Sequence, residues 1–112
     1  MIITKSEPFT LEEIQKLQEA HGDYIKAVID LERKICSAGA TQHRDSYDLL
    51  LKDGSNHEHT WGGGIMRDTK EITYTSMINI RPTEGNQSNS IDNEEVREKF
   101  TGLIKYFFAK IL

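Results

Sequence analysis

The chain has few of the residues that mark several large protein classes. One cysteine among 112 residues excludes an intramolecular disulfide framework. No apolar run approaches the roughly 20 residues that a membrane-spanning helix requires, so no membrane partner is expected. Lysine and arginine number 14 against 18 acidic residues, a formal net charge of −4, whereas a nucleic-acid surface needs a basic patch. The composition therefore indicates a soluble acidic protein without a nucleic-acid partner.

The N-terminal segment also lacks an export signal. Such a signal has a positive start followed by about 7–15 apolar residues, and only Ile2 and Ile3 are apolar between Met1 and Pro8. We therefore expect a cytoplasmic protein in which Cys36 is a reduced thiol. The length suits one domain over residues 1–112, because domains most often run to roughly 100–150 residues.

Two segments carry helical spacing behind a capping signal. Thr10 and Glu13 have the spacing of a capping box, which predicts a helix from about Leu11 to His21 that ends at Gly22. Asp92 and Glu95 repeat this spacing before a closing helix. Its apolar stripe comprises Val96, Phe100, Leu103, Ile104, Phe107, Phe108 and Ile111.

Alternation with a period of two predicts the strands. Within residues 24–33, one face carries Ile25, Ala27, Ile29 and Leu31, and the other carries Tyr24, Lys26, Val28, Asp30 and Glu32. Further strands are predicted at the start of the chain (Ile2 and Ile3), at 45–52, from 57 to about 66, and over 71–81. Residues 34–42 would connect two strands, and 83–91 would form a polar loop. The run Gly62-Gly63-Gly64 indicates a bulge or bend.

Together these elements predict an α+β fold in the order (β)αββββα. An antiparallel sheet of four or five strands would have helices packed on one face. The strict alternation supports this arrangement, because strands that are buried on both faces do not alternate. The second face of the sheet would then be polar and open to a ligand.

A group of ionisable side chains on that polar face is the first candidate site. If the two strands that hold them pair as a symmetrical hairpin, Asp30 lies opposite Asp45 and Glu32 lies opposite His43, with about 5 Å between Cβ atoms. Three carboxylates beside an imidazole would suit general acid–base chemistry or a divalent cation. The alternative is a solvated face whose charge is neutralised by Arg33, Lys34 and Arg44.

A second candidate lies at the end of the segment 71–81. Its members share the polar face of this strand or of its expected neighbour: Lys26, Thr73, Thr75, Asn79 and Arg81. Arg81 can hold a carboxylate or phosphate with two hydrogen bonds, and Asn79 can donate and accept beside it. The alternative is structural: Arg81 pairs with Asp30 or Glu32, and Asn79 caps the following loop.

The segment His57-Glu58-His59 precedes Trp61 and is a weaker candidate. Alternate histidines on a strand can reach one Zn²⁺, but the site would need at least one further ligand. The alternative is a pair of exposed histidines beside a buried Trp61. No metal ligand is assigned from this pattern.

Several short motifs resemble a known family. They are Tyr24-Ile25-Lys26, Asp30-Leu31-Glu32-Arg33, His43 with Asp45, Asp53-Gly54-Ser55 with Trp61-Gly62, and Ile78-Asn79-Ile80-Arg81-Pro82. From about Tyr24 to Ile91 the chain resembles a family of small bacterial hypothetical proteins classed as a domain of unknown function. The resemblance implies a bacterial, cytoplasmic source and brings no activity, cofactor or catalytic residue with it.

Two hypotheses from different classes remain. In the first, the polar sheet face binds a small polar or anionic ligand or a divalent metal, with catalysis left open, through Lys26, Asp30, Glu32, His43, Asp45, Asn79 and Arg81. In the second, the chain is a homo- or hetero-oligomeric interaction module without catalytic activity. The closing helix has more apolar residues than one sheet face requires, so Phe107 or Phe108 would contact a partner, most simply a second copy in a homodimer.

Overall fold

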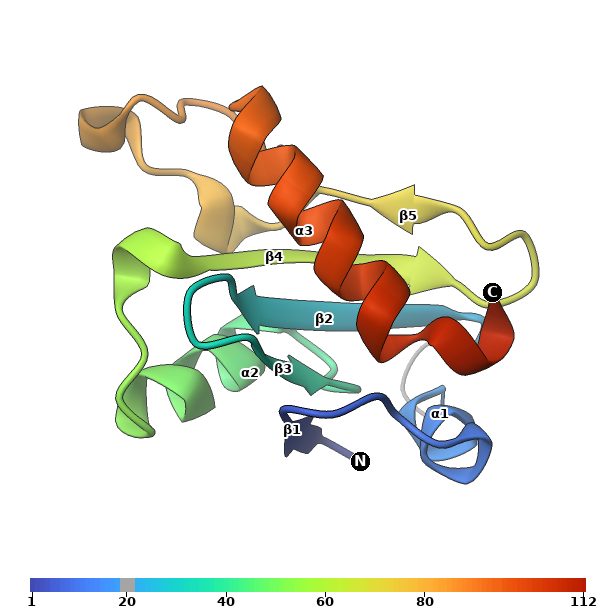
Figure 1. The fold of residues 1–112 in the computed structure, drawn as a ribbon. Coiled ribbons are helices and arrows are strands. Elements are labelled where there is room, and N and C mark those ends of the chain that lie inside the picture. Colours follow the sequence, from blue (N-terminus) through green and yellow to red (C-terminus); the bar gives the residue numbers. More distant parts are fainter. Residues whose placement is uncertain (19–21) are drawn as a thin grey trace.

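The computed structural model describes residues 1–18 and 22–112 as an antiparallel sheet with helices against it (Figure 1). The sheet has five strands in the order β1-β3-β2-β4-β5. The strands are β1 (Ile3–Lys5), β2 (Tyr24–Asp30), β3 (Ile35–Ala38), β4 (Thr60–Met66) and β5 (Ile72–Thr73). The described α-helices are α1 (Leu11–Leu17), α2 (His43–Lys52) and α3 (Glu94–Phe107). The predicted α+β class and antiparallel sheet are confirmed.

Short 3₁₀ helices join these elements: η1 (His57–His59), η2 (Met77–Asn79), η3 (Pro82–Glu84) and η4 (Ala109–Ile111). The capping box predicted before α1 is present, with the Thr10 side chain and Glu13 each bonding the other's backbone N–H. The helix ends at Leu17 with Gln18 as its C-cap, earlier than predicted, and the rest of the predicted continuation to His21 lies outside the described residues. The cap of α3 is Asn93, one residue later than the predicted Asp92.

The central strand β2 has the facing that its alternation predicts. It pairs with β3 on one side and with β4 on the other, so that Ile29 lies opposite both Cys36 and Trp61. Paired residues of antiparallel strands share a face, and the first hydrophobic core therefore collects side chains from all three strands. These are Ile25, Ala27, Ile29, Cys36, Ala38, Trp61 and Ile65.

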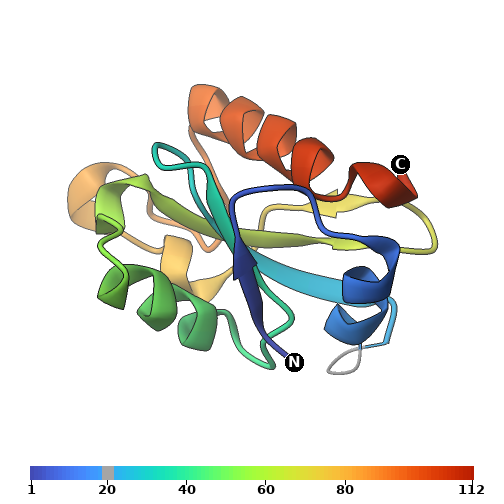
Figure 2. The same cartoon turned by 60° about the horizontal axis from the view of Figure 1, so that its bottom comes forward.

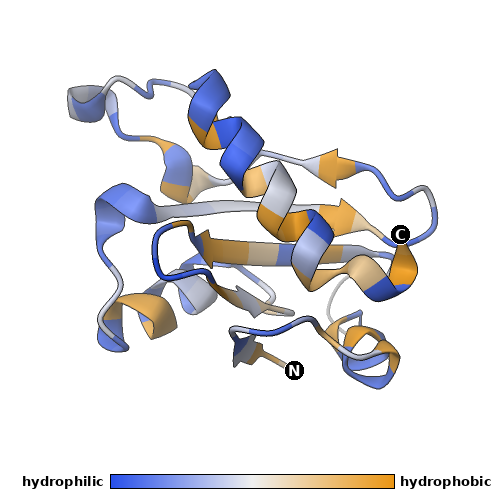
Figure 3. Ribbon diagram, viewed as in Figure 1, coloured by the Kyte–Doolittle hydropathy of each residue, from blue (hydrophilic) through white to orange (hydrophobic). Residues whose placement is uncertain are grey.

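The helix α3 crosses this face, and hydrophobic residues gather beneath it (Figure 3). The expectation that Phe107 or Phe108 contacts a partner is wrong, because both side chains are fully buried. The turn η4 bends the chain after α3, so Phe108 packs on Phe9 with 5.2 Å between ring centroids. The backbone N–H of Phe9 also donates to the carbonyl of Phe107 at 2.9 Å. The apolar residues at the end of α3 thus pack against Phe9 of the N-terminal segment.

The segment 43–52 is a helix and not the predicted strand. The buried side chains of α2 include Tyr47 and Leu50, whose spacing of three places them on one helix face. They pack against Val28 and Ile78 in a second hydrophobic cluster, on the sheet face opposite α3. Figure 2 shows α2 and α3 on opposite sides of the sheet. Helices therefore cover both faces of the sheet, and the prediction of helices on one face is wrong. The order of strands and α-helices is βαββαββα instead of the predicted (β)αββββα.

The predicted hairpin between residues 24–33 and 43–52 is consequently absent. Asp30 pairs instead with Ile35 of β3 and Thr60 of β4, so part of the predicted connection 34–42 is a strand. A tight turn joins β2 to β3, and Lys34 within it has a positive φ of 56°. The sequence did not indicate this turn, because lysine is not a typical residue for the left-handed region.

The glycine run in β4 produces neither a bulge nor a bend. The strand pairs with β2 at every position from Thr60 to Met66. A Cβ at Gly63 would lie 2.3 Å from the carbonyl oxygen of Thr73 and 2.9 Å from the ring of Phe100. The glycines are therefore required for close packing, which is the other reason for glycine inside a strand.

Candidate functional site

The four residues of the first predicted cluster do not lie together. Asp30 ends β2, Glu32 lies in the turn that follows, and both line one pocket. His43 and Asp45 lie in the first turn of α2, and His43 lines a different pocket together with Lys26. Because Lys26 and Asp30 are four residues apart on one strand, their Cα atoms are separated by about 13 Å.

Asp30 stabilises the turn that follows β2. Its side chain is buried, and Oδ1 accepts hydrogen bonds from the backbone N–H groups of Glu32 (3.0 Å) and Arg33 (2.9 Å). Its carbonyl accepts a third from the N–H of Lys34 at 2.8 Å. The carboxylate of Asp30 thus shapes the β2–β3 hairpin.

Glu32 leaves Asp30 and pairs with a histidine of η1. Its Oε2 lies 2.6 Å from Nε2 of His59, and Oε1 of Glu58 lies 3.2 Å from the same nitrogen. Both carboxylates are largely exposed. One histidine nitrogen therefore faces two carboxylate oxygens, in an arrangement that the sequence did not predict.

Asn79 replaces a missing sheet neighbour of β4. The predicted strand 71–81 ends at Thr73, and the chain then turns through η2. The Asn79 side chain accepts from the N–H of Gly62 at 2.9 Å and donates to the carbonyl of Gly62 at 2.9 Å. It also donates to the carbonyls of Tyr74 and Asn89. Its amide completes the edge of β4 where β5 has ended, and it fixes the loop before α3.

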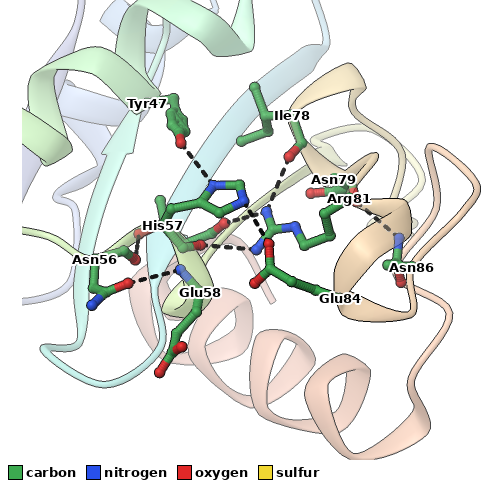
Figure 4. Close-up of polar contacts among 10 residues, drawn as sticks. Tyr47, Asn56, His57, Glu58, Ile78, Asn79, Arg81, Glu84 and Asn86 are labelled. Atoms are coloured by element: carbon green, nitrogen blue, oxygen red, sulfur yellow. Dashed lines mark hydrogen bonds and ion pairs between the residues drawn. The ribbon is translucent and has the colours of Figure 1, made fainter.

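Arg81 is buried in the same region and donates to backbone carbonyls. Its Nη1 reaches the carbonyl of His57 (2.8 Å), and its Nη2 reaches those of Thr60 (2.9 Å) and Ile78 (3.0 Å). Figure 4 shows the guanidinium between η1 and the loop that carries η2 and η3. Five donors on a planar group suit this clamp, which joins residues 57–60 to η2.

The predicted pairing of Arg81 with Asp30 or Glu32 is absent from the part of the chain that the structure describes. Desolvation lowers the pKa of Arg81, whereas the charge of Glu84 acts in the opposite direction. Arg81 also lies over the ring of Trp61, 3.8 Å from its centroid. Its Nε is buried without an acceptor. The residue therefore holds the fold together around Trp61.

The two histidines of η1 have different neighbours. Nδ1 of His57 lies 2.7 Å from the hydroxyl of Tyr47, and its Nε2 lies 3.2 Å from Oε2 of Glu84 (Figure 4). His59 instead faces Glu32, as described above. Among the described residues there is no group of three histidine, cysteine or carboxylate side chains arranged to hold a metal ion.

A basic pocket of about 330 Å³ lies at the start of α2 and joins two of the predicted site residues, Lys26 and His43. Arg44 and Ser76 line it as well, with Met77 and Ile78 forming an apolar wall. Nζ of Lys26 donates to the carbonyl of Thr41 at 2.9 Å. Nε2 of His43 must carry a proton, because it lies 2.7 Å from the carbonyl oxygen of Gly63, which can only accept.

The charge around this pocket is one-sided. Neither Lys26 nor Arg44 forms an ion pair with a described residue, and no carboxylate lines the cavity. The N-cap of α2 is Gln42, whose side chain makes no capping hydrogen bond. The partial positive charge of a helix N-terminus adds to the field of the basic side chains. Asp45 lies in the same first turn but is exposed and outside the pocket lining.

Cys36 takes no part in either pocket. It is fully buried in the first core, and burial raises the pKa of its thiol well above its usual range. A protonated, inaccessible thiol is a poor nucleophile.

Comparison with known proteins adds one match. The sequence model of the family described as "Protein of unknown function (DUF5674)" covers residues 1–107. The chain belongs to this family. The predicted resemblance to a domain of unknown function is thereby confirmed, and the match extends well beyond residues 24–91. No curated protein and no solved structure matches this DUF5674 chain. None of its described helices is long and apolar enough to cross a membrane.

Sequence reasoning missed Arg44 and Ser76 as pocket residues. The spacing of Tyr47 and Leu50 and the acidic Asp45 in the first turn were available signals for a helix at 43–52. Recognising that helix would have placed Arg44 beside His43 at its start. Ser76 carried no such signal. The alternating pattern of residues 71–81 predicts a strand there, whereas the strand ends at Thr73.

Proposed function

We propose that this DUF5674 protein binds a small anion, carrying a phosphate or carboxylate group, in the basic pocket at the start of α2. The supporting observation is that Lys26, His43 and Arg44 gather around one cavity of an otherwise acidic chain, with no carboxylate in the lining. This refines the predicted ligand site on the polar sheet face: two of its seven residues line the pocket, and the cation alternative has no support there.

Each group has a separate role in this proposal. Arg44 offers a planar fork to two anion oxygens, whereas Lys26 offers a single mobile charge. His43 is fixed by its bond to Gly63 and presents its ring to the cavity wall. The hydroxyl of Ser76 supplies a neutral hydrogen bond, and exposed Met77 covers an apolar part of the ligand. A cytoplasmic location, which would give access to phosphorylated and carboxylated metabolites, belongs to the same proposal.

The test uses inorganic phosphate and acetate as probes, followed by nuclear magnetic resonance of the backbone amides of Arg44 and Ser76. Saturable shifts of these amides are expected with at least one probe. The variant K26A/R44A should weaken binding by about tenfold or more. The matched control K16A/K110A removes two exposed charges from α1 and η4 and should bind as the wild type does. Absence of saturable shifts, or equal loss in both variants, would contradict the proposal.

A second candidate function is self-association through the edge strand β1. This strand has one neighbour, β3, within the described sheet, and exposed Ile2 and Leu49 lie beside it. An open edge with apolar neighbours is suited to pairing with another strand. Light scattering should then give twice the chain mass of 12.8 kDa, and I2K/L49K should restore the monomer. A monomer in the wild type would exclude this dimer.

A further inference from the structure

A third pocket, of about 330 Å³, lies on the α3 side of the sheet, away from the basic pocket. Trp61 of β4 forms its floor, and Leu31 and Val96 form apolar walls. Its polar rim comprises Glu32, Glu58, His59 and Lys99. The pocket shares no lining residue with the basic pocket at α2.

The floor of this pocket carries an unused hydrogen-bond donor. Trp61 is 6% exposed, and its indole N–H has no acceptor within residues 1–18 and 22–112. Among the described residues, the buried side-chain atoms without a hydrogen-bond partner are Oγ of Ser46 and Nε of Arg81. The indole N–H is not one of them. The N–H is therefore open to solvent, and the ring that carries it lines this pocket. Arg81, whose guanidinium lies 3.8 Å from the ring centroid, packs on the indole.

The rim carries the opposite surplus. Oε2 of Glu32 and Oε1 of Glu58 both approach Nε2 of His59, at 2.6 and 3.2 Å. One imidazole N–H cannot satisfy two carboxylates, so acceptor capacity and negative charge remain. A primary ammonium group brings three donors and a positive charge. Lys99, on α3, supplies the one lysine charge of the lining and is 3.7 Å from Glu95.

We propose that this pocket binds an α-amino carbonyl group with an apolar side chain, as found in a free amino acid or in the first residue of a peptide. The ammonium group donates to Oε1 of Glu32 and Oε2 of Glu58, the two oxygens that do not face His59, and the carbonyl accepts the indole N–H of Trp61. The apolar side chain packs on Leu31 and Val96. Lys99 favours the free amino acid, because it can pair with a carboxylate that a peptide replaces by an amide.

The experiment follows the indole N–H resonance, which is unique because the chain has a single tryptophan. L-Leucinamide should shift it saturably at millimolar concentration. N-Acetyl-L-leucinamide, which has the same body without the charge, should bind about tenfold more weakly or not at all. L-Leucine and Leu-Gly-Gly separate the two ligand sources, and K99A should weaken only the binding of L-leucine.

Two double variants decide the role of the carboxylates. E32Q/E58Q removes both rim charges at exposed positions and should reduce binding of L-leucinamide by about tenfold or more. E12Q/E71Q removes two exposed charges elsewhere and should leave binding unchanged. An unshifted indole resonance, equal binding of the acetylated compound, or full binding by E32Q/E58Q would each overturn the proposal. None of these results bears on phosphate or acetate at the α2 pocket, whose readout uses other residues.

Discussion

The guanidinium carbon of Arg81 lies 3.8 Å from the centroid of the Trp61 ring, and both side chains are buried. The guanidinium contacts the π face of the indole and donates to three backbone carbonyls, and the charge of Glu84 also favours its charged form, although no carboxylate forms an ion pair with it among the described residues. This contact links the loop 74–92 to the start of β4. It also sets the indole on which the α3-side pocket is built.

Replacement of this arginine by lysine should be strongly destabilising. A lysine cannot bond three divergent carbonyls or stack its charge over the ring in the same way, so Arg81→Lys should cost about 2–4 kcal/mol in urea unfolding. Tryptophan fluorescence provides the signal. Arg44→Lys, at an exposed position, is the control and should change stability by less than about 0.5 kcal/mol. An R81K protein with wild-type stability would show that the clamp contributes little.

Asp30 tests whether its charge or only its acceptor oxygen matters. Asparagine keeps an oxygen that can accept from the N–H groups of Glu32 and Arg33, so Asp30→Asn should cost about 1 kcal/mol or less. Asp30→Ala leaves both N–H groups without that acceptor and should cost about 1–3 kcal/mol. Thermal melts of the two proteins separate the cases. If the asparagine variant is as unstable as the alanine variant, the negative charge itself is required.

Two glycines offer a matched pair of alanine substitutions. At Gly63 a Cβ would lie 2.3 Å from the backbone carbonyl oxygen of Thr73, so Gly63→Ala should be severely destabilising or should fail to fold. At Gly102, inside α3, nothing lies within 4 Å of the added Cβ. Gly102→Ala should therefore stabilise the protein by about 0.5–1 kcal/mol. Similar melting temperatures for the two variants would disprove this account of the glycine run.

Acid stability should depend on Glu13. Hydrogen bonds from Lys5 and from the Thr10 backbone lower the pKa of Glu13 below its ordinary value of 4.5. A carboxyl group with a lowered folded-state pKa stabilises the fold above its unfolded pKa, and this contribution is lost as the pH falls through the folded value. Because the ion pair with Lys5 is partly exposed, its contribution at neutral pH is at most about 1 kcal/mol.

The measurement is the free energy of unfolding of wild type and Glu13→Gln between about pH 6 and about pH 3. Glutamine keeps the capping-box acceptor, so the variant isolates the charge. The wild-type advantage should be present at the upper end and should disappear at the lower end. Glu12→Gln, at an exposed position without a described hydrogen bond, should follow the wild-type curve. Parallel curves for wild type and E13Q would contradict the prediction.

The sequence pattern was sufficient to predict the features that depend on residues close together in the chain. The alternation of β2 follows from one buried face, and the Thr10–Glu13 box needs only four residues. The stripe of α3 was equally readable from its spacing, and so was the antiparallel α+β class. Lys26 and His43 were predicted as site residues, and the structure brings them to one pocket, although by a helix and not by the predicted hairpin.

Tertiary structure decided everything that depends on a distant partner. The segment 43–52 carried helical signals, but only the assembled fold shows that its Tyr47 and Leu50 pack against Val28 and Ile78. Asn79 and Arg81 do not lie in the predicted strand. Their side chains instead bond backbone groups of β4 and η1 that no neighbouring strand pairs. Periodicity encodes which side of an element is buried, but a polar side chain binds whatever backbone group the assembled fold leaves unpaired. Which backbone group is unpaired can be known only from the tertiary structure.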